Sequence, residues 1–91
     1  MKAIDGLHRV TGDVTPDCTG DYLRHVVWET RMSYRRTDGS YFIWWDGNMN
    51  WYISPAPGQT TGGVWFRHDE NIEGEYLWGE GATGNATVTE I

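Results

Sequence analysis

Carboxylates are the side chains of this chain best suited to acid–base chemistry, and the candidates are Asp38, Asp46, Asp69, Glu70, Glu73 and Glu75. A glycosidase requires two carboxyl groups about 5–9 Å apart. Asp38 and Asp46 each precede a glycine, which is typical of turn residues, and Asp69-Glu70 predicts an exposed tip between strands. A chain of 91 residues also offers little room for a cleft. We therefore expect no enzymatic activity and no catalytic residues.

Metal and nucleophile chemistry is not indicated by the remaining reactive residues. His8, His25 and His68 are scattered along the chain, without the close ligand spacing that metal sites use. Cys18 is the only cysteine, so no disulfide can form within the chain, and a lone thiol is usually an inert core residue. No glycine-rich phosphate loop occurs. We expect no metal and no cofactor.

Aromatic residues remain the strongest functional candidates. Exposed tryptophan and tyrosine rings can stack on sugars, and the candidate platform is Trp44, Trp51, Tyr52, Trp65 and Trp78, with Asn48 and Asn50 at the adjoining turn. The same rings also suit the core of a small domain, since each can bury roughly 150–250 Å². A protein-binding surface is a third use, because Trp, Tyr and Arg are enriched at interfaces. Arg31, Arg35 and Met32 suit that third use.

The charge is unevenly distributed along the chain. The net charge is −6. The six acidic and six basic residues of the segment 1–45 cancel, so the whole negative net charge arises in the segment 46–91. Nucleic acids and anionic membranes require clustered Lys and Arg, so we expect neither as a partner. No apolar segment follows Met1-Lys2, so we expect no secretory signal, and no apolar run reaches membrane-spanning length.

Alternation of apolar and polar residues predicts short strands separated by turns rich in Asp, Asn and Gly. Residues 1–6 are expected to form a lead-in, and 7–91 a single β-domain. The expected strands are 7–14, 21–28, 30–37, 40–45, 51–54, 64–67, 75–78 and 85–89, and 55–63 forms a long loop.

The segments 30–37, 40–45 and 51–54 predict a meander of three antiparallel strands, joined by turns at Asp38-Gly39 and Asp46–Asn50. The middle strand is apolar on both faces, with Ile43 and Trp45 on one and Trp44 on the other. Such a strand is covered on both sides or exposes one face to a partner. We predict an all-β fold, a small antiparallel meander that forms a sandwich or a partly closed barrel.

The order of several motifs carries a resemblance to a known family. These motifs are Pro16-Asp17, Thr19-Gly20-Asp21-Tyr22, Tyr34-Arg35-Arg36-Thr37-Asp38-Gly39, Trp44-Trp45, Trp51-Tyr52-Ile53-Ser54, Trp65, Gly74-Glu75-Tyr76 and Thr83-Gly84-Asn85-Ala86-Thr87-Val88. The chain resembles, from about Arg9 to Thr89, a small aromatic-rich β-module of uncharacterised proteins from marine phages and environmental bacteria. The resemblance implies a display or structural module and supplies no catalytic residue.

Two functions follow as expectations. The first is a non-enzymatic structural protein of a phage virion, such as a capsid decoration or cement protein, which is made in the host cytoplasm and binds a protein lattice such as the major capsid protein. Homo-oligomerisation is expected to help so small a fold. The alternative is an adhesin-like module that binds a glycan or a cell surface through exposed aromatic rings.

Overall fold

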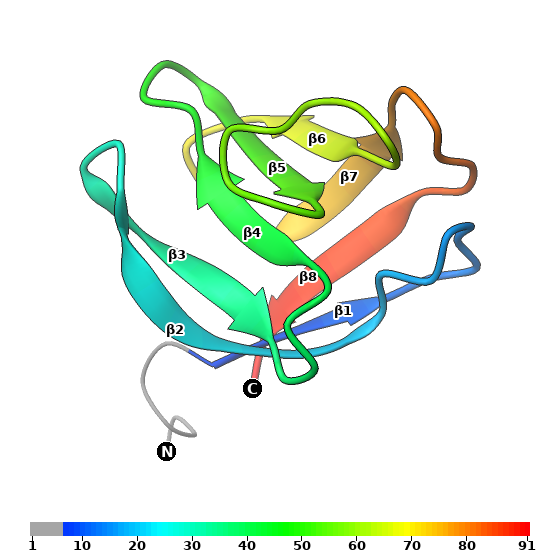
Figure 1. The fold of residues 1–91 in the computed structure, drawn as a ribbon, viewed down its shortest axis with the longest axis horizontal. Coiled ribbons are helices and arrows are strands. Elements are labelled where there is room, and N and C mark those ends of the chain that lie inside the picture. Colours follow the sequence, from blue (N-terminus) through cyan, green and yellow to red (C-terminus); the bar gives the residue numbers. More distant parts are fainter. Residues whose placement is uncertain (1–6) are drawn as a thin grey trace.

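Eight strands and no helix make up the part of the chain that the computed structural model describes, residues 7–91 (Figure 1). The expected lead-in 1–6 lies outside the described residues. The strands are β1 (His8–Thr11), β2 (Gly20–Trp28), β3 (Arg31–Arg36), β4 (Phe42–Trp45), β5 (Asn50–Ser54), β6 (Trp65–His68), β7 (Gly74–Trp78) and β8 (Ala86–Glu90). Each predicted strand is present.

The strands follow one another around a closed antiparallel barrel, in which β8 returns to pair with β1. Val10 lies opposite Val88 in this closing pair, and Gly20 lies opposite Val10 on its other side. Closure leaves no sheet edge unpaired, which removes the usual site of edge-to-edge aggregation. The all-β meander is thereby confirmed, and the barrel is fully closed.

The barrel interior is filled mainly by alternate residues of the strands, and two residues of the connections add to it. Tyr22, Ile43, Ile53, Trp65 and Tyr76 are each completely buried. The remaining core members are Val10, Cys18, Trp45, Trp51, Ala82, Ala86 and Val88. Large rings thus supply much of the apolar burial, as a short chain requires.

A row of apolar side chains crosses the outer surface of four adjacent strands. The register places Trp44 opposite Tyr52, Tyr52 opposite Phe66, and Phe66 opposite Leu77. We call these four residues the outer apolar row. At its β4 end, Trp44 is 3% exposed, and its ring stacks on that of Tyr52 with the centroids 4.7 Å apart. The β4 strand is therefore covered on both faces, one of the two arrangements expected for it.

The β2–β3 hairpin carries a second group of exposed apolar residues, Leu23, Val26 and Val27, which we call the hairpin patch. A bulge between Arg24 and Val27 interrupts the pairing of these two strands. The turn is formed by Glu29 and Thr30, whose φ angles are 50° and 76°. Our prediction that Thr30 begins a strand is wrong, because its left-handed backbone belongs to the turn.

The first strand is also shorter than the predicted segment 7–14. It ends at Thr11, before Gly12, whose φ is 141°. A Cβ atom at Gly12 would lie 2.6 Å from the carbonyl oxygen of Asn85, so the chain bends here at a position that only glycine fits.

Candidate functional site

Three of the five predicted platform rings are buried. The exposed fractions of Trp44, Trp51 and Trp65 are 3%, 4% and 0%. The Trp65 indole donates a hydrogen bond to the Gly84 carbonyl at 2.8 Å, and that of Trp44 donates to the Ser54 hydroxyl at 2.9 Å. We therefore correct the proposed sugar platform, since rings buried to this degree cannot stack on a surface ligand.

Arg31 and Trp51 do come together, at the end of the barrel near the β6–β7 turn. The Arg31 guanidinium lies 3.9 Å from the centroid of the Trp45 ring and donates to the Glu70 carbonyl at 2.9 Å. The Trp51 indole donates to the same carbonyl at 2.9 Å. Arg31 and Trp51 thus both fix the Glu70 backbone at this end of the core. The cation–π contact between Arg31 and Trp45 therefore has a structural role.

Asn48 and Asn50 belong to the turn that Asp46 organises. The Asp46 carboxylate accepts hydrogen bonds from the backbone NH groups of Asn48, Met49 and Asn50 at 2.8, 3.2 and 3.1 Å. The Asn50 amide also donates to Asp46 at 2.9 Å and lies 2.9 Å from Nδ1 of His68. Asn48 is exposed, whereas Asn50 is committed to the turn.

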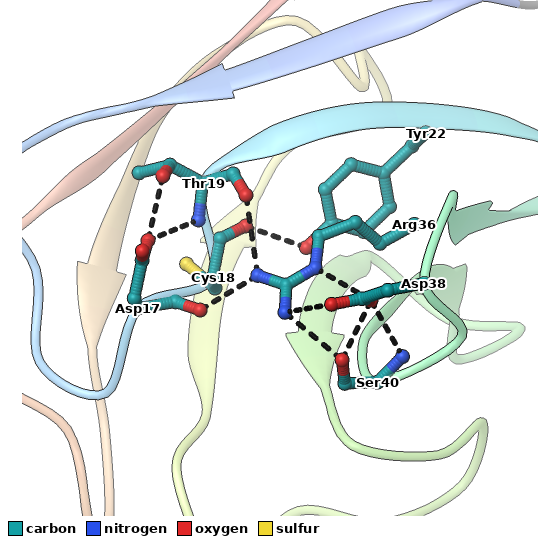
Figure 2. Close-up of polar contacts among 7 residues, drawn as sticks. All are labelled: Asp17, Cys18, Thr19, Tyr22, Arg36, Asp38 and Ser40. Atoms are coloured by element: carbon teal, nitrogen blue, oxygen red, sulfur yellow. Dashed lines mark hydrogen bonds and ion pairs between the residues drawn. The ribbon is translucent and has the colours of Figure 1, made fainter.

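Arg36 is the centre of a polar cluster that our sequence analysis did not single out (Figure 2). The guanidinium donates to both carboxylate oxygens of Asp38 at 2.9 and 2.7 Å and to the Ser40 hydroxyl at 2.9 Å. It also donates to the carbonyls of Asp17 and Thr19 at 2.7 and 3.2 Å. These bonds match the five N–H groups that an arginine has, so Arg36 fastens the chain between β1 and β2 to the β3–β4 turn.

The hydrogen bonds of the cluster favour the charged forms of its carboxyl groups. The hydrogen bond from Arg36, reinforced by Ser40, holds the pKa of Asp38 well below its usual range. Hydrogen bonds from Thr19 lower the pKa of Asp17, and Arg9 lowers that of Asp21. A carboxylate stabilised in this way is a poor general acid at neutral pH. Residues 7–91 hold no group of three or more His, Cys, Asp or Glu arranged to bind a metal ion.

Cys18 lies behind this cluster and is completely buried. Its carbonyl accepts a hydrogen bond from the Tyr22 hydroxyl at 2.6 Å (Figure 2), and burial raises the pKa of its thiol to about 12. We expect a thiol reagent at pH 8 to leave the folded protein unlabelled, since about 10⁻⁴ of such a thiol is ionised. Labelling in urea should be complete within the mixing time. Fast labelling of the folded protein, measured by mass, would contradict this assignment.

Arg35 and Trp78 are two predicted residues that lie at the surface beside exposed apolar groups. Arg35 on β3 lies opposite Leu23 on β2 and opposite Phe42 on β4, on the outer wall. Trp78 at the end of β7 is 53% exposed.

Trp78 borders a hollow of about 330 Å³ whose other lining residues are Phe66, Leu77 and Asn85. We call it the Trp78 hollow. Leu77, 48% exposed, and Phe66 belong to the outer apolar row, so the hollow lies at the β7 end of that row. Asn85 donates to the Glu75 carboxylate at 3.1 Å, which places an amide and an acid beside the apolar floor.

Comparisons with known proteins yield no match to any protein-family model, curated protein or solved structure. Among the residues that the structure describes, no helix is long and apolar enough to cross a bilayer. The function must therefore be argued from the chain's own surface, and the resemblance to phage modules stays a prediction.

Proposed function

We propose that this chain is a non-enzymatic structural protein, most concretely a phage virion component such as a capsid decoration protein that binds a protein lattice. One observation carries the proposal: apolar groups are exposed on two outer walls, while the interior is closed. Leu23, Val26 and Val27 are exposed on β2, and Leu77 and Trp78 are exposed on β7. Exposed apolar patches of this kind mark protein contacts. The virion assignment draws its support from the sequence resemblance.

A repetitive partner suits these patches because each is small. A single contact of a few apolar side chains is weak, whereas contacts repeated over a lattice of identical sites give high avidity. The acidic residues of the segment 46–91 would keep the outward surface hydrated and soluble.

Density-gradient fractionation of a lysate from the native source, probed with an antibody, tests the proposal. We expect the protein to co-sediment with intact particles in fixed stoichiometry. A Leu77→Ser/Trp78→Ser variant should lose particle binding, and Met49→Ser, an exposed apolar residue outside both patches, should retain it. A protein that stays at the top of the gradient would contradict the virion role.

Glycan binding is the second candidate, and the Trp78 hollow favours it. An exposed tryptophan beside the Asn85 amide and the Glu75 carboxylate could stack on a sugar ring and bond its hydroxyls. A saturable change in tryptophan emission on glycan titration, abolished by Trp78→Ala in a folded protein, would support this function. An emission spectrum that glycans leave unchanged would exclude it for the glycans tested.

A further inference from the structure

The two exposed apolar groups lie on opposite walls of the barrel. The hairpin patch belongs to β2, and the Trp78 hollow is bordered by β6 and β7. In a closed barrel ordered from β1 to β8, β2 and β6 are separated by half the circumference. Figure 1 shows β2–β3 and β6–β7 on opposite sides of the barrel. One molecule therefore presents two separate contact faces.

The wall of the hairpin patch has uncompensated positive charge. Arg35 lies opposite Leu23 and is exposed, so it carries the charge of this wall; Arg24 is also exposed but lies opposite Tyr34, on the other face of β2. Neither arginine makes an ion pair with any residue in 7–91, where the ion pairs engage Arg9, Arg31, Arg36 and Arg67. Asp21, the acid nearest to them along β2, is already paired with Arg9 at 2.8 Å.

The wall of the Trp78 hollow has the opposite charge. Glu75 and Leu77 flank the buried Tyr76 on β7 and share the outer face, and Glu73 and Glu80 are exposed just before and just after the strand. None of the three forms an ion pair with an arginine within the described chain; Glu75 instead accepts a hydrogen bond from Asn85. Arg67, the one arginine of β6, is paired with Asp69 at 3.7 Å.

We propose that the hairpin patch of one copy docks on the Trp78 hollow of a second copy, so that the protein associates head to tail. This inference rests on the proposed structural role and identifies one of the protein's partners as a second copy of the chain. Each face combines apolar groups with a charge that attracts the other face and repels its own kind. A symmetric dimer would oppose Arg35 to Arg35 or Glu75 to Glu75 and is disfavoured. Contacts between opposite walls propagate as a row, which suits a lattice.

Sedimentation velocity over a concentration series at low salt tests the inference. We expect the average mass to rise above 10.4 kDa without stopping at the dimer, and to fall again as salt is added. Arg35→Glu and Glu75→Arg should each weaken association roughly tenfold or more, because like charges then meet. An equimolar mixture of the two variants should associate again, since each broken face finds its complement in the other variant.

Glu75→Gln keeps an acceptor for Asn85 and removes only the charge, so it should weaken association without altering the fold, as thermal melting followed by circular dichroism would verify. A wild-type protein that stays monomeric at its highest soluble concentration would overturn the inference, as would folded single variants whose mixture fails to associate. Co-sedimentation of a strictly monomeric protein with particles would overturn self-association alone and leave the virion role intact.

Discussion

A Trp65→Ala variant is expected to lose about 3–5 kcal/mol of unfolding free energy, the usual cost of truncating a buried tryptophan. Trp65 is completely buried, packs edge-on against Tyr41, and donates its indole hydrogen to the Gly84 carbonyl at 2.8 Å. The substitution leaves a cavity and an unpaired carbonyl together. Because small domains have about 5–15 kcal/mol in total, this loss is a large fraction of the unfolding free energy.

Urea titration followed by far-ultraviolet circular dichroism measures the loss, and Trp78→Ala is the matched control. Trp78 lies directly opposite Trp65 in the β6–β7 register, yet 53% of its surface is exposed. Its removal should change the unfolding free energy by about 0.5 kcal/mol or less, as for most surface substitutions. Equal losses in the two variants would show that our assignment of core and surface is wrong.

The contrast between these two tryptophans marks what the sequence could not predict. Strand positions were predictable because alternation and the Asp38-Gly39 and Asp46-Gly47 turns are local signals. Which aromatic ring is buried depends on barrel closure and on what packs over each ring. Trp65 is the first residue of β6 and its partner Trp78 is the last residue of β7, yet Trp65 is completely buried and Trp78 is 53% exposed.

Closure itself is a non-local property of the chain. The pairing of β1 with β8 joins residues about as far apart as the described chain allows, such as His8 and Glu90. Nothing in the sequence of either segment indicates that it pairs with the other. A sandwich and a partly closed barrel were therefore equally compatible with the alternation of apolar and polar residues. The interior could thus be predicted as aromatic without predicting which rings fill it.

The Arg36 cluster was missed for a related reason. Its local half was visible, since Asp38-Gly39-Ser40 is a turn signal and Asp38 bonds both the backbone and the hydroxyl of Ser40. Its other half is made of two backbone carbonyls, those of Asp17 and Thr19, and any residue type supplies a carbonyl. A side chain that binds distant backbone leaves almost no trace in the sequence.

An Arg36→Ala variant is expected to lose about 2–3 kcal/mol, because charge-assisted hydrogen bonds are strong and their loss leaves the carbonyls of Asp17 and Thr19 without this donor. Arg36→Lys should recover only part of the loss, since an ammonium group cannot reproduce the two-point contact with Asp38. Urea titration at neutral pH measures both variants. A stability equal to that of the wild type would show that water replaces these bonds without cost.

Protonation of Asp38 in acid should remove the stabilisation that this cluster provides. Its pKa is lowered in the folded protein, so its contribution to stability is complete above its unfolded pKa of about 4 and is lost as the pH falls below that value. Asp38→Asn removes this titration, and its stability should approach that of the wild type as the pH falls from about 7 to about 2. Urea midpoints at each pH provide the comparison, with Asp13→Asn as an exposed control. A constant gap between wild type and Asp38→Asn would mean that Asp38 does not link the fold to pH.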